Sequence, residues 1–127
     1  TLNYYNDFSL SMEKIKIDFL RFLIDRKVTG ERVAAYGAAA KGNTLLNFCG
    51  VKADLIDFVS DRAESKQGKY LPGSRIPVYS EDEIKKRKPN YIVIFSWNIR
   101  DEIEQQLYYI KEWHGKFVTA IPELKIS

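Results

Sequence analysis

The alternation of short apolar runs with helical patterns most constrains what this chain can fold into. The runs at residues 33–36 and 91–96 consist mainly of aliphatic and aromatic residues, without the polar residue at every second position that marks a half-exposed strand. Such runs are typical of a parallel sheet whose two faces are covered by helices. Right-handed crossovers then predict an α/β fold, a Rossmann-like three-layer sandwich of about five mainly parallel strands in the order 3-2-1-4-5.

The remaining elements follow from the same patterns, and no repeat or linker divides the chain. Ser80 and Glu83 form the S-x-x-E pattern of a capping box, which starts the third predicted helix. The stretch 62–75 is too rich in turn residues to be regular. Helices are predicted at 9–27, 41–48, 80–86 and 99–113, and strands at 33–36, 55–59, from residue 76, 91–96 and 116–121.

Composition excludes several classes of function. The 127 residues carry 20 basic and 17 acidic side chains, and a formal net charge of +3 is too small for a nucleic-acid-binding surface. The basic run at 85–88 falls where a helix ends, and there it complements the helix dipole. No apolar run reaches the roughly 20 residues of a membrane span, and the first residues do not resemble a signal peptide. We therefore expect a cytoplasmic protein that binds neither nucleic acid nor membrane.

The residues needed for catalysis or metal binding are also scarce. Cys49 is the single cysteine and His114 the single histidine, so a Cys/His zinc site is excluded and we predict no metal. Cys49 lies in an apolar helical pattern and is expected to be a small buried residue. His114, beside Gly115, is expected at a helix C-terminus. We assign no catalytic residue.

The turn at residues 37–44, with the sequence GAAAKGNT, joins the first strand to a helix. It does not match the G-x-x-x-x-G-K-[ST] phosphate loop, because Asn43 stands where the lysine belongs and Lys41 precedes Gly42. It does not match G-x-G-x-x-G either, because Ala39 replaces the second glycine. Nucleoside-triphosphate hydrolysis and ordinary NAD binding are therefore disfavoured.

The physical basis of phosphate binding is nevertheless present in this turn. Gly37 allows a tight turn, the small side chains from Ala38 onward leave backbone N–H groups accessible, and a helix start attracts anions. Lys41 adds a charge, and Asn43 and Thr44 add donors, so we expect a phosphate or diphosphate here. The alternative is that small residues only let helix and sheet pack closely.

The predicted strand order brings a second loop to the same place. Strands 1 and 4 are neighbours where the winding reverses, and ligands favour the crevice at their carboxyl ends. The loop after strand 4 is Ser96, Trp97 and Asn98. Trp97 either packs under the sheet or stacks on a base or sugar, and Asn98 either caps the following helix or contacts the ligand.

Two further features have alternative interpretations. Asp61 ends the second strand, where Rossmann folds place the acid that binds a ribose hydroxyl, or it is a loop acid neutralised by Arg62. Tyr70, with Lys66 nearby, lies in a long loop that either closes on a substrate or merely connects two strands at the sheet edge.

Three segments, YGAAAKGNTLLNF, SDRAESKQGKYLPGSRIPV and WNIRDEI, together resemble the C-terminal domain of S-adenosylmethionine-dependent sugar C-methyltransferases. The resemblance runs from about Val33 to the end. It implies a Rossmann-like domain that lies against a separate S-adenosylmethionine-binding domain, with a dTDP-sugar-like nucleotide-sugar between them. The chain opens without a methionine, and we expect residues 1–31 to lead in from the missing domain and residues 32–127 to form the C-terminal domain.

The resemblance also implies which residues face the nucleotide-sugar. They are Gly37, Lys41, Gly42, Asn43 and Thr44 of the turn, Lys66, Gln67, Gly68, Tyr70, Pro72 and Gly73 of the long loop, and Trp97 and Asn98. The family's zinc-binding part and its S-adenosylmethionine domain are absent, so the isolated chain is not expected to methylate anything. The alternatives are a non-catalytic ligand-binding or interaction module and a divergent NAD-dependent oxidoreductase domain.

Overall fold

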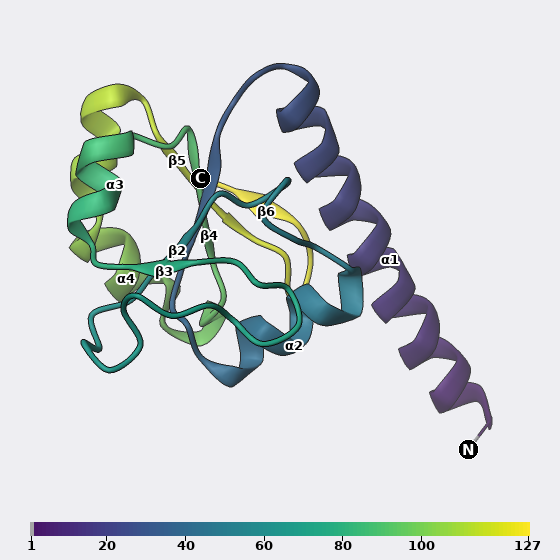
Figure 1. The fold of residues 1–127 in the computed structure, drawn as a ribbon. Helices are drawn as coiled ribbons and strands as arrows, with labels where there is room; N and C mark the ends of the chain where they lie inside the picture. Colours follow the sequence, from purple (N-terminus) through teal and green to yellow (C-terminus); the bar gives the residue numbers. More distant parts are fainter. Residues whose placement is uncertain (1) are drawn as a thin grey trace.

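The structure of the protein, a computed structural model, describes residues 2–127, and its side chains from residue 11 onward. Its described residues contain one six-stranded sheet with the order β3-β2-β1-β4-β5-β6 (Figure 1). The strands are β1 (Val33–Tyr36), β2 (Val59–Ser60), β3 (Val78–Tyr79), β4 (Tyr91–Ile94), β5 (Lys116–Thr119) and β6 (Lys125–Ile126). The predicted order 3-2-1-4-5 is confirmed, and β6 extends it.

The central strands β1 and β4 are parallel and in register from Val33 opposite Tyr91 to Tyr36 opposite Ile94. β2, β3 and β5 also run parallel to their neighbours, and only β6 is antiparallel, against β5. The carboxyl ends of β1 and β4 therefore lie side by side, and the two loops that leave them start from the same place.

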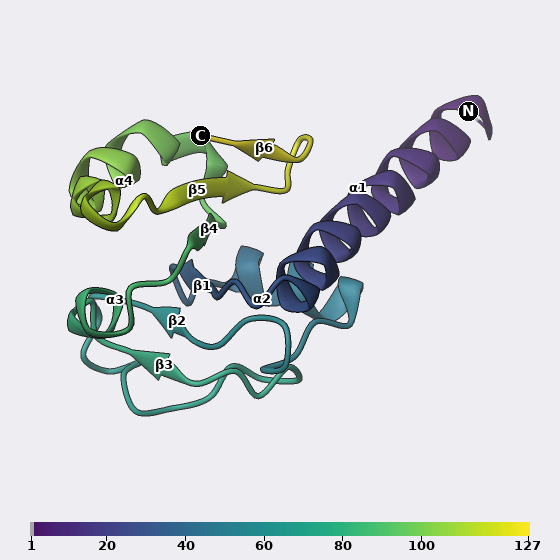
Figure 2. The ribbon, with the colours of Figure 1, turned by 90° about the horizontal axis from the view of Figure 1, so that it is seen from above.

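Helices cover both faces of the sheet, as predicted for a three-layer sandwich. On one face, α1 (Leu2–Val28) and α2 (Ala40–Cys49) pack on Ala35, Val93 and Val118. On the other, α3 (Asp82–Arg87), α4 (Arg100–Gln106) and the 3₁₀ helix η2 (Tyr108–Trp113) cover Ala34, Ile92 and Phe117. Figure 2 shows that the N-terminal half of α1 projects beyond the sheet, while its C-terminal half lies against it. None of the described helices has the length and apolarity needed to cross a membrane.

The structure corrects the predicted helix at 99–113. The segment is divided into the 3₁₀ helix η1 (Trp97–Ile99), α4 and η2. Ile103, Leu107 and Ile110 are all buried, but the Ile110 amide donates to the Leu107 carbonyl, three residues back. The step from 107 to 110 suits a 3₁₀ turn as well as an α-helix, so apolar spacing alone does not distinguish them.

Two other expectations on local structure are also wrong. No capping box starts α3, because the Glu83 carboxylate accepts from Arg87 Nε at 2.8 Å rather than reaching back toward Ser80. The predicted strand at 55–59 is reduced to β2, because the Leu55 and Ile56 amides donate to the Lys52 carbonyl in a turn. Other local expectations are confirmed: Gly50 and His114 end their helices in the left-handed conformation, and Cys49 is buried.

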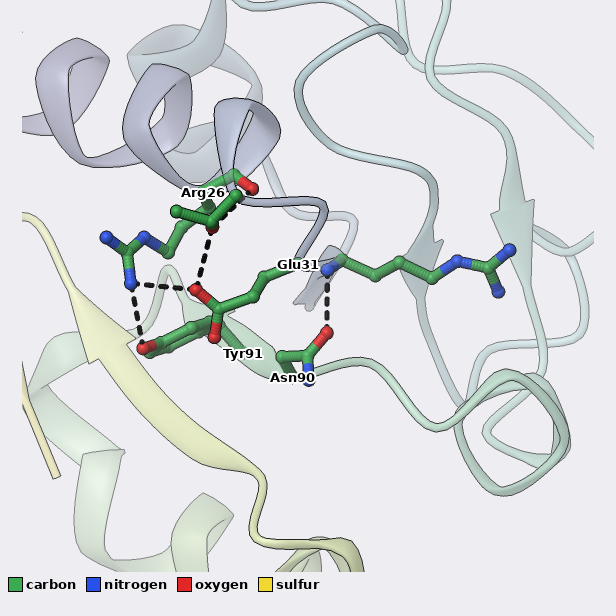
Figure 3. Close-up of polar contacts among 6 residues, drawn as sticks. Arg26, Glu31, Asn90 and Tyr91 are labelled. Carbon is green, nitrogen blue, oxygen red and sulfur yellow. Dashed lines mark hydrogen bonds and ion pairs between the residues drawn. The ribbon is translucent and has the colours of Figure 1, made fainter.

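A polar cluster fixes α1 to the amino ends of β1 and β4 (Figure 3). Arg26 Nη1 donates to Glu31 Oε1 at 2.9 Å and to Tyr91 Oη at 3.3 Å. The guanidinium also lies 5.6 Å from the ring centroids of Phe22 and Tyr91. Asn90 Oδ1 accepts from the amide of Arg32 at 2.7 Å, which joins the starts of the two strands. Since Tyr91 is 8% exposed, its hydrogen bond lies at the edge of the core.

We predict that Tyr91→Phe lowers the free energy of unfolding by about 1 kcal/mol, because a partly buried guanidinium loses one acceptor. Urea unfolding measures the change. Tyr108→Phe is the matched control, since Tyr108 is 67% exposed, and it should change stability by less than about 0.5 kcal/mol. Equal effects of the two substitutions would show that the Tyr91 hydroxyl does not hold α1.

Candidate functional site

The candidate site is built on the turn between β1 and α2. Gly37 has φ 97°, a left-handed conformation that glycine adopts without strain, and its amide donates to the Ser60 carbonyl at 2.8 Å. Ala39 is extended, with φ −92° and ψ 165°, and its carbonyl accepts from the Asn43 amide as α2 begins. The turn is thus anchored to β2 on one side and opens into α2 on the other.

Asp61 holds this turn through backbone groups. Its Oδ2 accepts from the Ala38 amide at 2.7 Å and its Oδ1 from the Ala63 amide at 2.8 Å. Neutralisation of Asp61 by its neighbour is not what the structure shows, because Arg62 pairs with Glu81 at 3.8 Å. Contact between Asp61 and a ribose hydroxyl stays a prediction.

Two residues of the long loop reach the same turn. Lys66 Nζ donates to the Ala38 carbonyl at 3.1 Å, and Gln67 Nε2 donates to the Asp61 carbonyl at 2.9 Å. The structure therefore brings Lys66 and Gln67 together with Ala38 and Asp61. These contacts connect the β2 side of the turn to the loop that follows β2.

The α2 side of the turn is open. Ala39, Ala40 and Lys41 are exposed, and no side chain caps the helix. In the part of the chain that the structure describes, no acceptor receives a hydrogen bond from the amides of Ala40, Lys41 and Gly42. Unpaired N–H groups at the start of a helix, beside an ammonium group, suit an anion such as phosphate.

Gly42 has a packing role. A Cβ built on it would lie 2.3 Å from the ring of Phe95, directly after β4, so only glycine lets α2 approach the sheet this closely. Of the two interpretations given to the small residues of this turn, close packing therefore holds at Gly42. Asn43 is half-buried and its Oδ1 is buried without a partner among the described residues, while Thr44 is exposed.

Lys41 and Trp97 contact each other and line the same cavity. Lys41 Nζ lies 4.9 Å from the centroid of the indole ring. The cavity has a volume of about 430 Å³ and is lined by Met12 of α1, by Ala40, Lys41, Thr44, Leu45 and Phe48 of α2, and by Trp97 and Ile121. The turn after β1 and the loop after β4 thus share one site, as the strand order predicted.

Five of the residues that line the cavity were not among the predicted site residues: Met12, Ala40, Leu45, Phe48 and Ile121. Phe48 and Leu45 carried a signal, because they lie one helical turn beyond Thr44 and Lys41, on the same face of α2. Met12 and Ile121 carried none, because they come from distant segments whose positions are set by tertiary packing.

The remaining predicted site residues of the long loop make their contacts with neither Lys41 nor Trp97. The ring of Tyr70 stacks with Arg75 at 5.1 Å, and Tyr70 pairs with Pro77 as an antiparallel bridge. The Pro72 carbonyl accepts from Asn47 Nδ2 at 3.2 Å, and Gly73 packs against the same Asn47. Gly68 donates its amide to the Val78 carbonyl. This part of the loop is a connection at the sheet edge, and its contact with a ligand stays a prediction.

Ser96 and Asn98 flank Trp97 in the loop after β4. The Ser96 carbonyl accepts from the Ile99 amide at 3.0 Å, which closes η1. Asn98 is exposed and makes no capping hydrogen bond, so the interpretation of Asn98 as a helix cap is wrong. Ligand contact by either residue stays a prediction.

Cys49 is not part of this site. It is 3% exposed, and burial raises the pKa of its thiol. A protonated, buried thiol is a poor nucleophile.

In a comparison with known families, residues 1–122 match the C-methyltransferase C-terminal domain. The chain is also 35% identical over 122 residues to the C-methyltransferase NovU of Streptomyces niveus, a stretch that is 96% of this chain and 29% of that relative. The chain thus spans less than a third of the curated relative.

Comparison with solved structures gives the fold. The crystal structure of UDP-D-quinovosamine 4-dehydrogenase from Vibrio fischeri matches with a TM-score of 0.50 and 16% identity, over 76% of this chain and 93% of that one. At this identity the likeness concerns the α/β, Rossmann-type fold alone.

We predict that Gly42→Ala destabilises the domain by about 1–3 kcal/mol, because the added methyl group overlaps the Phe95 ring. An exposed helical glycine would show the opposite sign, with alanine about 1 kcal/mol more stable. Chemical denaturation distinguishes the two signs. The penalty should shrink in a Phe95→Leu background, because the smaller side chain leaves room; an unchanged penalty there would rule out the clash.

Proposed function

Because the chain belongs to the family of C-methyltransferase C-terminal domains, we propose that it binds a nucleotide-sugar and positions it for methyl transfer by a separate S-adenosylmethionine-binding domain. The observation that carries the proposal is the meeting of Lys41 with Trp97 beside the open first turn of α2. An anion site and an aromatic surface adjoin there, at the switch point of a parallel sheet. A sugar nucleotide offers a diphosphate to the first and a ring to the second.

The diphosphate is assigned to the first turn of α2. The amides of Ala40 and Lys41 are exposed, and the helix dipole and the Lys41 ammonium both favour negative charge. The contacts of Asp61 and Lys66 leave this side of the turn free. Ligand binding would therefore not require the β2 side of the turn to rearrange.

S-adenosylmethionine suits this site less well than a sugar nucleotide does. Its reacting sulfur is a sulfonium cation, and Lys41 together with the start of α2 repels positive charge. The methyl donor is therefore assigned to another domain of the parent protein, which is also the proposed partner of this chain. What the present chain supplies is position: an acceptor carbon held beside a methyl group reacts as if the step were unimolecular.

The activity of the parent protein is part of the proposal, since the chain spans only 29% of NovU. We further propose that the protein acts in the cytoplasm, because its cysteine is a buried free thiol and needs no oxidising compartment.

Isothermal titration calorimetry with dTDP, a dTDP-sugar, NAD and S-adenosylmethionine tests the proposal. Binding of the two dTDP ligands without NAD or S-adenosylmethionine is the expected result. Binding of NAD alone would favour an oxidoreductase domain, and a lack of binding by all four would favour an interaction module.

We predict that Lys41→Ala weakens dTDP binding about tenfold, the loss expected for one hydrogen bond to a charged group. The slope of log affinity against log salt should also become shallower, because one ion contact is lost. Lys52→Ala is the matched control, since Lys52 is exposed beyond the far end of α2. If both variants bind dTDP like the unmodified chain, Lys41 does not contact the diphosphate.

A further inference from the structure

Most of the residues that line the cavity beside Lys41 are apolar. Its lining consists of Met12, Ala40, Leu45, Phe48, Trp97 and Ile121, with Lys41 and Thr44 as the only residues whose side chains carry a hydrogen-bonding group other than the indole N–H. A volume of about 430 Å³ falls within the range of small-molecule sites. Nothing in the proposed diphosphate contact requires this space.

The cavity and the proposed anion site share two residues. Ala40 and Lys41 line the cavity and also form the first turn of α2. A group attached to a diphosphate at this turn would therefore lie next to the cavity and Trp97.

The Lys41 ammonium occupies the face of Trp97. A cation 4.9 Å from an indole centroid gains about 0.5–1 kcal/mol when exposed. That interaction covers the indole surface on which a planar ring would stack. A phosphate at the first turn competes for the same charge, and an ammonium–phosphate contact is the stronger of the two.

We propose that this cavity is the subsite for the nucleobase, and that Lys41 covers it until an anion at the first turn of α2 draws the ammonium away from Trp97. The proposal rests on the proposed function, because it takes the ligand to be a nucleotide. It adds where the base binds and which residue controls access.

The cavity suits a base better than a sugar. A base stacks its flat face on an aromatic side chain, which is worth about 1–3 kcal/mol, and places its polar atoms at the edge. A sugar ring carries hydroxyl groups in several directions, and most of them would lack partners among apolar walls. Thr44 also lines the cavity, and its hydroxyl offers a hydrogen bond to the edge of a base.

The arrangement makes binding of the two halves of a nucleotide cooperative. An anion removes the cover from Trp97, so the base binds better when the anion is present. Linkage requires the reverse as well: a stacked base keeps the ammonium available for the anion. Without Lys41 this coupling disappears, although stacking remains.

The experiment titrates thymidine into the unmodified chain with and without saturating inorganic pyrophosphate, and follows the indole N–H signal of Trp97 by NMR. The Trp113 indole donates to the Pro89 carbonyl at 2.9 Å, away from the cavity, and serves as an internal reference. We expect pyrophosphate to raise thymidine affinity about fivefold or more, the lower end of usual couplings between sites. We expect the Trp97 signal to shift and the Trp113 signal to stay.

Two variants isolate the role of Lys41. In Lys41→Ala, thymidine should bind with the same affinity with and without pyrophosphate, at a pyrophosphate concentration that saturates that variant. In Lys16→Ala the coupling should persist. Lys16 Nζ also lies over an aromatic ring of the cavity, Phe48, at 5.5 Å, but it belongs to α1 and not to the anion site.

The possible outcomes separate this inference from the proposed function. If dTDP binds while thymidine affinity is independent of pyrophosphate in the unmodified chain, Lys41 does not control access to Trp97. The proposed nucleotide binding is then unaffected. If a 6-deoxyhexose such as fucose shifts the Trp97 signal and thymidine does not, the base assignment is overturned. If neither pyrophosphate nor dTDP binds, both proposals fail together.

Discussion

The close approach of α2 to the end of β4 is the constraint on which the rest of the site depends. Gly42 lies against the Phe95 ring with no room for a side chain, so the first turn of α2 lies directly above the sheet. That contact sets where the free amides of Ala40 and Lys41 lie relative to Trp97, two residues after Phe95. The pairing of β1 with β4 brings the two loops of the switch point together, and Gly42 lets the first turn of α2 pack closely beside the second loop. Gly42 contacts no proposed ligand. Its close packing on Phe95 nevertheless sets the position of the first turn of α2 in the candidate site.

The electrostatics of the turn are divided between its two sides. On the β2 side, the carboxylate of Asp61 satisfies the amide of Ala38, and Lys66 and Gln67 bond backbone carbonyls. These hydrogen bonds all lie within the chain and hold the β2 side of the turn in place. On the α2 side, donors are left free and the mobile charge of Lys41 rests on an aromatic ring. The charged groups of the β2 side, Asp61 and Lys66, are both engaged with backbone groups, whereas the Lys41 ammonium faces only an aromatic ring; the proposed anion site is therefore placed where α2 begins.

The order of the first five strands was predictable because each of the five has its own apolar run and because crossover handedness leaves few orders to choose from. β1 was predicted residue for residue. β6 was not, since the two residues Lys125 and Ile126 carry no pattern and pair only because β5 is in place. The turn GAAAKGNT was recognised from glycine and helix-start chemistry, which is local. The cavity was not, because Met12 and Ile121 reach it from opposite ends of the chain, and no local rule places them. The long loop was the hardest case: Lys66 bonds the turn while Tyr70 stacks on Arg75 at the edge, so neighbours in sequence have different surroundings.

Ala39 stands where the dinucleotide-binding pattern has its second glycine, and this difference gives a physical reason for the proposed role of Lys41 in anion binding. In dinucleotide-binding turns the second glycine lets the backbone approach the pyrophosphate closely. Ala39 is exposed and extended, a conformation open to any residue, so nothing in the fold demands glycine there. Its methyl group keeps an anion farther from the backbone, and the attraction of amide dipoles falls off steeply with distance. The attraction of a full charge falls off more slowly. In the proposed site, the charge of Lys41 therefore adds to the attraction of the first-turn amides, and in the structure the exposed ammonium lies against the Trp97 indole.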